Sequence, residues 1–248
     1  MRLWLARRHW NLFAKTDPYW AVLTEPDKQG QRWKIDEFFE TGRNDVRATL
    51  QRVREVLPDW RPAGDALDFG CGVGRLSQAL ASHFDRVTGV DISREMLAHA
   101  RRHNRHGERV TYIENTEPSL ARFADGSFAF VLSLITLQHI APEYSCRYVE
   151  EFIRTCASGG VVVFQLPARA LRPPKPRRFT LWLPTHWKRL KPALRRWLVL
   201  EATMEMHPVP RPDVEAIVAK SGGSVVAVDS LPNAGPDYVS YRYIVRRT

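Results

Sequence analysis

Hydrophobic residues in this chain gather into short runs, and longer segments with one apolar side lie between these runs. The runs have the length and composition of strands in a buried sheet, and they cover residues 66–69, 87–91, 110–114, 128–134, 161–164, 225–228 and 238–245. The segments between them predict helices over residues 76–84, 93–100, 144–156 and 210–220. Strands that alternate with helices in this way are typical of a doubly wound α/β fold.

Local signals predict several element boundaries. Ser93 is expected to cap the helix that follows it, because a serine oxygen can accept a hydrogen bond from a free N–H group in the first turn. Gly159 and Gly160 are expected to stop the helix over 144–156 before the next strand begins. Nearer the N-terminus, a helix is predicted from about Asn44 to Leu57, and it is preceded by Trp33, Phe38, Phe39 and Gly42.

The first predicted strand runs into a turn with glycines at 70, 72 and 74. Glycine allows a tight turn and a close approach of a ligand to the backbone. The second strand ends on Asp91, close to the spacing at which an acid accepts hydrogen bonds from two ribose hydroxyls. A dinucleotide fingerprint needs a further glycine where this chain has Arg75, and the carboxylate of Asp68 would repel a phosphate and attract an ammonium group. The pattern therefore predicts a nucleoside pocket whose ligand carries an amine and no phosphate.

The motif D-F-G-C-G-V-G, followed by G-V-D-I-S, resembles that of the class I S-adenosylmethionine-dependent methyltransferases, over roughly residues 60–166. The resemblance implies a Rossmann-like seven-stranded sheet and S-adenosylmethionine as the cofactor. In this family an acidic or amide side chain after the third strand contacts the adenine, and this chain has Asn115 and Thr116 there. The cofactor-binding residues expected on this basis are Asp68, Gly70, Gly72, Gly74, Asp91, Ile92, Met96, Asn115, Thr116 and Ser133.

His139 is the candidate catalytic residue, because it follows the fourth predicted strand in a loop that borders the methyl group in this family. Its ordinary pKa suits a general base, which methyl transfer needs mainly when a hydroxyl is the acceptor. A purely structural role for this histidine stays open. The segment resembles one in which some quinone-pathway and RNA-end methyltransferases use a Glu-His pair that can bind a metal. Gln138 replaces that glutamate and removes a charged ligand, so no metal is expected.

Length and composition favour one large core, with 248 residues of which 44% are hydrophobic. We expect an N-terminal helical cap over 1–59 and a methyltransferase domain over 60–248, with a basic lid-like insertion over 167–206. Three cysteines without C-x-x-C spacing indicate neither a disulfide framework nor a zinc site. Charges interrupt the first apolar residues too early for a signal peptide, and no run reaches membrane-spanning length. A cytoplasmic protein is therefore expected.

The formal net charge of +10 is concentrated in one part of the chain. No Asp or Glu occurs over 152–200, which carries a charge of +11, so the rest of the chain is close to neutral. Over 185–200, tryptophans and leucines recur at helical spacing among lysines and arginines. Three interpretations stay open: a lid whose charges face solvent, a basic wall that recruits an anionic acceptor, and a helix that rests on an anionic membrane surface.

The sequence thus predicts an S-adenosylmethionine-dependent methyltransferase that acts on a small or medium polar acceptor. The favoured target is an oxygen on a sugar, as in a glycan, or on a natural product. One alternative is an RNA methyltransferase that uses the basic insertion for phosphate contacts, although no N-P-P-[YF] motif follows the fourth strand. Another is a non-catalytic subunit that binds S-adenosylmethionine beside a partner. Neither the acceptor's identity nor the oligomeric state follows from the sequence.

Overall fold

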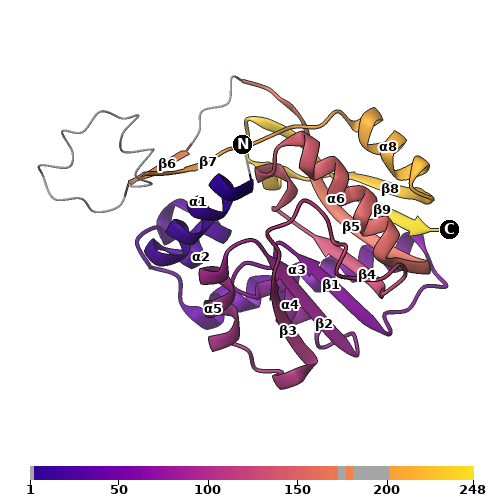
Figure 1. The fold of residues 1–248 in the computed structure, drawn as a ribbon, viewed down its shortest axis with the longest axis horizontal. Coiled ribbons are helices and arrows are strands. Elements are labelled where there is room, and N and C mark those ends of the chain that lie inside the picture. Colours follow the sequence, from indigo (N-terminus) through magenta and orange to yellow (C-terminus); the bar gives the residue numbers. More distant parts are fainter. Residues whose placement is uncertain (1–2, 173–176, 181–200) are drawn as a thin grey trace, which may run out of the picture.

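A mixed seven-stranded sheet forms the centre of the molecule (Figure 1). The computed structural model describes residues 3–172, 177–180 and 201–248, and the helix predicted over 185–200 lies outside them. Within the described residues the strand order of this sheet is β3-β2-β1-β4-β5-β9-β8. The strands are β1 (Asp65–Phe69), β2 (Arg86–Asp91), β3 (Val110–Glu114), β4 (Phe128–Ser133), β5 (Cys156–Ala170), β8 (Gly223–Ser230) and β9 (Tyr238–Arg247). The predicted doubly wound α/β fold is confirmed.

The direction of the strands places a crevice at one edge of the sheet. β1 to β5 run parallel, whereas β9 lies antiparallel between β5 and β8. The strand order reverses at β1, which has β2 on one side and β4 on the other. In open α/β sheets, ligands bind at such a reversal, beyond the carboxyl ends of the strands. A separate antiparallel pair, β6 (Arg177–Thr180) and β7 (Glu201–Met204), contacts α1 (Leu3–Thr16) through β7.

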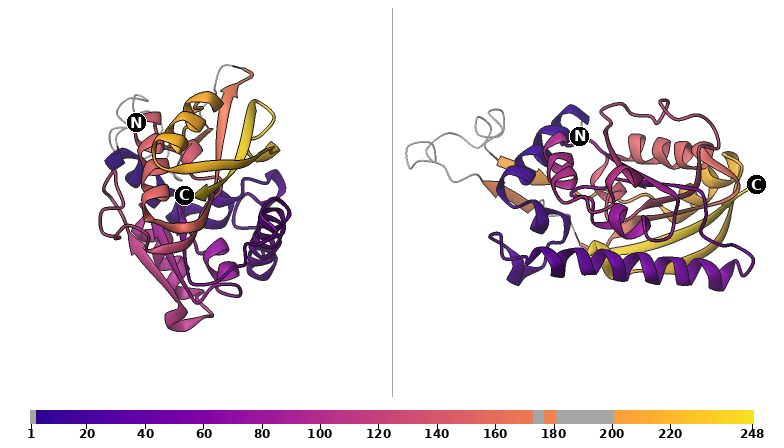
Figure 2. Two further views of the ribbon diagram at one scale, coloured as in Figure 1. Left: turned by 90° about the vertical axis from the view of Figure 1, so that its right-hand side faces the viewer. Right: turned by 90° about the horizontal axis from the view of Figure 1, so that it is seen from below.

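Each face of the sheet packs on its own set of helices, because successive strand residues point to opposite sides. One face packs against α3 (Ile35–Val56), α4 (Arg75–Leu80) and α5 (Arg94–Arg102). The other packs against α6 (Pro142–Thr155) and α8 (Arg211–Lys220). Ala66 belongs to the first core and its neighbour Leu67 to the second, and Val161 and Val162 alternate in the same way. Figure 2 shows α3 as a long helix along one side of the molecule.

The N-terminal helices α1 and α2 (Pro18–Val22) form a third apolar cluster with the start of α3. Phe13 and Trp20 belong to this cluster, together with Val73 of the glycine turn and Met96 of α5. The cluster therefore holds α1 and α2 against the same edge of the sheet at which the strand order reverses.

The start of α3 differs from its prediction. The helix begins at Ile35, so Phe38, Phe39 and Gly42 lie inside it and not before it. Glycine is ordinarily unfavourable within a helix. Here a Cβ added at Gly42 would lie 2.4 Å from the main-chain oxygen of Arg75. Glycine is therefore required for the close approach of α3 to α4.

The prediction that Gly159 and Gly160 stop a helix is wrong. The helix ends at Thr155, and β5 begins at the next residue. The glycines lie within β5, near an irregularity in its pairing with β4, and Gly159 has a φ of +74°. Beyond that point β5 continues to Ala170 because it pairs with β9. The boundary expected at residue 167 for the insertion thus falls inside a strand.

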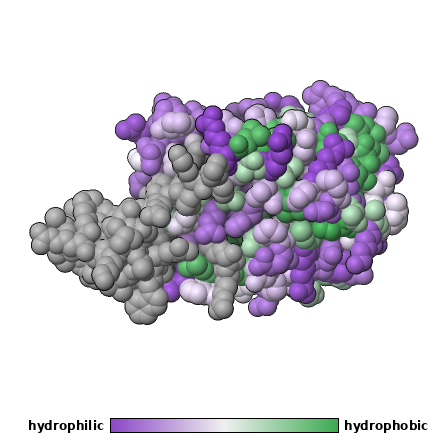
Figure 3. Space-filling model, turned by 90° about the horizontal axis from the view of Figure 1, so that it is seen from above, coloured by the Kyte–Doolittle hydropathy of each residue, from purple (hydrophilic) through white to green (hydrophobic). Residues whose placement is uncertain are grey.

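The surface carries hydrophobic residues in separate patches between hydrophilic ones, on the face drawn in Figure 3. Among the side chains that the structure describes, the exposed large hydrophobic ones are Trp4, Ile35 and Leu171. Within the described ranges, no helix has the length and apolar character needed to cross a membrane.

Candidate functional site

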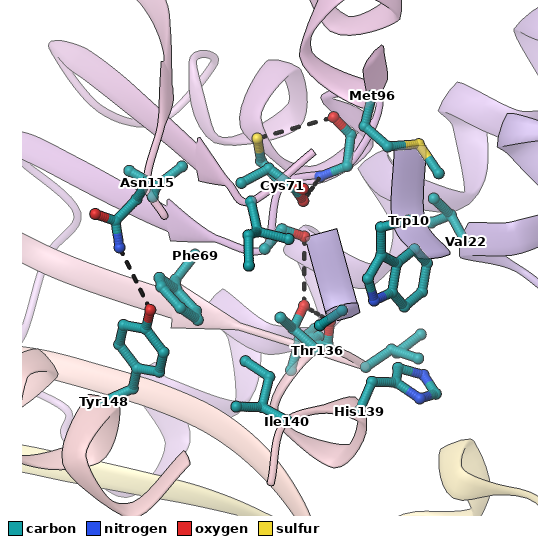
Figure 4. Close-up of a pocket in the computed structure, with 18 of the residues that line it drawn as sticks. Trp10, Val22, Phe69, Cys71, Met96, Asn115, Thr136, His139, Ile140 and Tyr148 are labelled. Atoms are coloured by element: carbon teal, nitrogen blue, oxygen red, sulfur yellow. Dashed lines mark hydrogen bonds between the residues drawn. The ribbon is translucent and has the colours of Figure 1, made fainter. Parts of the chain in front are cut away.

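A cavity lies beyond the carboxyl ends of β1, β2 and β4, and α1 and α2 contribute to its lining (Figure 4). The predicted residues that line it are Gly70, Gly72, Asp91, Ile92, Met96, Asn115 and His139. The cavity therefore brings together residues from four separate segments of the chain.

Asp91 is held at the end of β2 by two backbone N–H groups. Gly72 donates to Oδ2 at 2.9 Å, and Ser93 donates to Oδ1 at 2.8 Å. Burial raises the pKa of Asp91 to about 6, whereas these two hydrogen bonds lower the pKa. A carboxylate has about four acceptor positions, so Asp91 can accept two further bonds from a ligand. The predicted cap is confirmed, because the Ser93 side chain accepts a bond from the Met96 N–H group.

Asp68 lies behind the glycine turn and does not line the cavity. Its side chain is buried and accepts a hydrogen bond of 2.6 Å from Ser77 Oγ in α4. Burial raises the pKa of Asp68 to about 6, and the bond from Ser77 opposes that rise. From this position the carboxylate fixes α4 to β1. Three more predicted residues are absent from the cavity lining: Gly74, Thr116 and Ser133.

Asn115 forms one end of the cavity together with aromatic rings (Figure 4). Its Nδ2 donates to the main-chain oxygens of Glu117 and Ser119, both at 3.1 Å. Because these bonds engage the amide hydrogens, Asn115 can offer a ligand its carbonyl oxygen as an acceptor. The rings of Phe69 and Tyr148 lie beside it, with their centroids 4.4 Å apart. This end suits a flat ring that carries an amino group.

The loop after β4 contains a strained residue. Ile135 has a φ of +61°, a conformation that β-branched residues rarely adopt. Its N–H group donates to Gln165 Oε1 at 3.2 Å, and Gln165 Nε2 donates to Ser240 Oγ at 3.0 Å. Thr136 packs on the glycine turn, where a Cβ added at Gly70 would lie 2.1 Å from its side chain. Residues of β5 and β9 therefore hold this loop against the glycine turn.

His139 has hydrogen-bond partners at both ring nitrogens. Nδ1 lies 2.7 Å from the main-chain oxygen of Glu205. A carbonyl oxygen only accepts, so we assign the ring proton to Nδ1. Nε2 then accepts from the Gln138 amide at 3.1 Å. Trp10 packs edge-on against the ring, with the centroids 5.4 Å apart. In this state Nε2 is the basic nitrogen, and the Gln138 amide covers it.

α1 is attached to the rest of the site by polar contacts. Ser93 Oγ donates to Asn11 Oδ1 at 2.8 Å, which joins α1 to the start of α5. Arg7 pairs with Glu114 at the end of β3 over 2.6 Å. These contacts keep the cavity-facing side of α1 in place.

Comparison with known proteins gives a family match over the centre of the chain. Residues 66–160 match a family model described as a methyltransferase domain. A ubiquinone biosynthesis O-methyltransferase of Xanthomonas campestris is 34% identical over 116 residues, which cover 46% of this chain and 44% of that protein. One from Vibrio parahaemolyticus is 33% identical over 111 residues, which cover 43% and 45% of the two chains. The chain spans about half the length of the curated relatives it matches.

Solved methyltransferase structures share the fold along the whole chain. The magnesium protoporphyrin IX methyltransferase of Synechocystis PCC 6803 with bound SAH has a TM-score of 0.65, at 16% identity and with 100% of both chains covered. The DhpI–SAH complex has a TM-score of 0.61, at 19% identity, and covers 99% of this chain and 97% of that one. The family match includes the glycine turn and Asp91. Residues 66–160 thus match a methyltransferase domain, and the chain has the fold of solved methyltransferases.

Some residues that line the cavity, or that hold a loop beside it, were not predicted. Trp10 and Gln165 are two of them. The helical spacing of Ala6, Trp10 and Phe13 is a signal that could have identified the inner side of α1. Gln165 offers no comparable signal, because its two partners lie 30 and 75 residues away in the sequence.

Proposed function

We propose that this protein transfers a methyl group from S-adenosylmethionine to an oxygen atom of a small, largely apolar acceptor. The observation that carries the proposal is the setting of Asp91, which lines the cavity at the point where the strand order reverses. The match of residues 66–160 to a methyltransferase domain supports the same reaction.

The residues of the cavity fit this cofactor. Asp91 has two acceptor positions left for the ribose hydroxyls, and Asn115 offers its carbonyl oxygen to the adenine amino group. Ile92 and Met96 supply apolar surface for the ring. When bound, S-adenosylmethionine supplies an electrophilic methyl group on a sulfonium centre. The chain's own task is to align that methyl group with the acceptor and to exclude water.

The remaining lining favours an acceptor with an apolar body. α1 contributes Leu3, Ala6 and Trp10, and the loop after β4 continues into Ile140 and Ala141. Each buried hydroxyl without a partner costs about 1–3 kcal/mol, so a sugar with several hydroxyls suits these side chains poorly. A hydroxylated natural product suits them better. The curated relatives named ubiquinone biosynthesis O-methyltransferase support oxygen as the accepting atom.

We assign the role of proton acceptor to Nε2 of His139. The bond from Nδ1 to Glu205 orients the ring, and the acceptor hydroxyl would replace the Gln138 amide at Nε2. The substitution His139→Asn tests this role, because an asparagine amide can still donate to the Glu205 carbonyl. General-base catalysis predicts a rate loss of about 10²- to 10⁴-fold with unchanged cofactor affinity. An unchanged rate would leave the ring as a structural link only.

A transfer assay with radiolabelled S-adenosylmethionine tests the proposed reaction. The acceptor panel contains hydroxylated aromatic and aliphatic molecules beside free sugars and RNA. Label in the apolar hydroxylated molecules, lost on treatment that cleaves methyl ethers, supports the proposal. Label in sugars or RNA alone would overturn the acceptor class. Cofactor binding without transfer to any fraction would favour the non-catalytic subunit.

A further inference from the structure

A second groove lies between α3, α4 and the segment after α5. It is lined by Phe39, Arg43, Arg75, Gln78, Ala79, Ser82, Arg105 and His106. Arg75 is the only described residue that lines both this groove and the cofactor cavity. The groove therefore adjoins the proposed methyl-transfer site but has its own set of side chains.

The lining of the groove is rich in positive charge. Arg43, Arg75 and Arg105 contribute guanidinium groups, and no carboxylate is among the described residues that line it. Each arginine meets an acid that lies outside the lining: Glu40 at 2.5 Å from Arg43, Asp45 at 2.5 Å from Arg75, and Asp36 at 2.9 Å from Arg105. A guanidinium group has five N–H donors, so these pairs leave further donors for a ligand.

Two buried donors at the groove have no acceptor. Arg75 and Gln78 are 3% and 7% exposed, and the atoms Arg75 Nε and Gln78 Nε2 have no hydrogen-bond partner. A buried donor without a partner costs about 1–3 kcal/mol. Both atoms carry hydrogens, so the missing group in each case is an acceptor. Oε1 of Gln78 accepts from the Arg105 N–H group at 3.3 Å, so Nε2 is the atom of this amide that is left for a ligand.

We propose that this groove binds a small phosphate-bearing molecule. Phosphate oxygens accept the several hydrogen bonds that arginine presents, and arginine is preferred where such groups are recognised. Phe39 and Ala79 add apolar surface, which gives room for an organic group attached to the phosphate.

The existing ion pairs do not prevent such binding. The side chains of Arg43 and Glu40 are about half exposed, and those of Arg105 and Asp36 are 65% and 84% exposed. Exposed pairs of this kind contribute about 0–1 kcal/mol, so a doubly charged anion can exchange with the acids at little cost. The pair of buried Arg75 with Asp45 can stay intact, because the free donor of Arg75 is Nε.

Calorimetric titration of the full chain with inorganic pyrophosphate, at constant ionic strength, tests the site. The variants are Arg43→Gln and Arg105→Gln, each of which removes one guanidinium group from the rim. Arg86→Gln is the matched control, because Arg86 is also exposed and paired with an acid, Asp65 at 2.8 Å, but does not line the groove. Gln78→Leu removes the unpaired donor and also Oε1, the acceptor of the Arg105 N–H group, so thermal melting verifies that this variant is folded.

We expect saturable binding that weakens about tenfold in Arg43→Gln and in Arg105→Gln, and that also weakens in Gln78→Leu. Arg86→Gln should bind as the unaltered protein does. Absence of saturable binding at millimolar pyrophosphate would overturn the proposal. An equal loss in Arg86→Gln would do the same, because it would indicate unspecific attraction to positive charge. The readout does not involve methyl transfer, so it stays separate from the test of the proposed reaction.

Discussion

Because Ile135 has a left-handed backbone, we expect a glycine variant at this position to be more stable than an alanine variant, which is the reverse of the usual order. At an ordinary position, a protein with glycine is less stable than one with alanine by roughly 0.5–1 kcal/mol, because glycine loses more conformational freedom on folding. At a φ of +61°, alanine suffers a steric cost of about 1–2 kcal/mol that glycine does not. Both replacements remove the same side chain beyond Cβ. The difference between Ile135→Gly and Ile135→Ala is therefore the strain less the entropy cost of glycine, and the glycine variant should be the more stable by about 0.7 kcal/mol.

Urea unfolding of the two variants, followed by circular dichroism, measures this difference. Ile135→Asn serves as a third variant, because asparagine tolerates the left-handed region better than alanine does. We expect stability to rise from alanine through asparagine to glycine. The glycine variant should nevertheless transfer methyl groups more slowly, because the loop beside the cavity loses its defined conformation. An alanine variant as stable as the glycine variant, or more so, would refute the assigned strain.

Three further outcomes follow from the site. Gln165→Leu should lower the transfer rate more than cofactor affinity, because it removes the acceptor of the Ile135 N–H group; steady-state kinetics beside calorimetry separates the two effects. Trp10→Ala should raise the KM for an apolar acceptor, whereas Trp4→Ala, on the same helix but 55% exposed, should not; equal effects would remove Trp10 from the acceptor wall. Burial raises the pKa of Asp68 and of Asp91 to about 6, above about 3.9 in an unfolded chain, so the folded state holds these protons more tightly. The cofactor-free protein should therefore lose stability as pH rises from about 4 to about 7, by on the order of 2–3 kcal/mol per group. In urea unfolding, the Asp91→Asn variant should lack the part of this loss that Asp91 contributes.

Elements with local signals were predictable from the sequence. The serine cap at Ser93 needs only residues three positions apart, and the strand predicted over 110–114 has the same bounds in the structure. The glycine turn and Asp91 belong to one strand-turn-helix-strand unit, so their spacing was enough to place both at the cavity. A feature could be predicted from the sequence wherever the residues that form it lie close together in the chain.

Features that depend on distant contacts were not predictable in the same way. Gly42 looks like a helix breaker, and only the approach of α3 to Arg75 explains its place inside a helix. Gly159 likewise looks like a helix stop, whereas the pairing of β5 with two neighbouring strands decides its position. The hydrogen bond from Ser77 of the next helix to the Asp68 carboxylate likewise has no local signal in the sequence. In each case a contact made after folding decides the outcome.

The affinity of S-adenosylmethionine for the unaltered protein and for Asp91→Ala, measured by calorimetry at pH 7.5, tests the central claim most directly. Asp65→Ala is the control, because Asp65 is an acid at the start of β1, at the end of the strand away from the glycine turn. Thermal melting verifies that each variant is folded. We expect the unaltered protein and Asp65→Ala to bind S-adenosylmethionine, and we expect Asp91→Ala to lose affinity by about a hundredfold or more, since two hydrogen bonds to a charged group disappear. Equal affinity in a folded Asp91→Ala variant, or no binding by the unaltered protein, would contradict the assignment of Asp91.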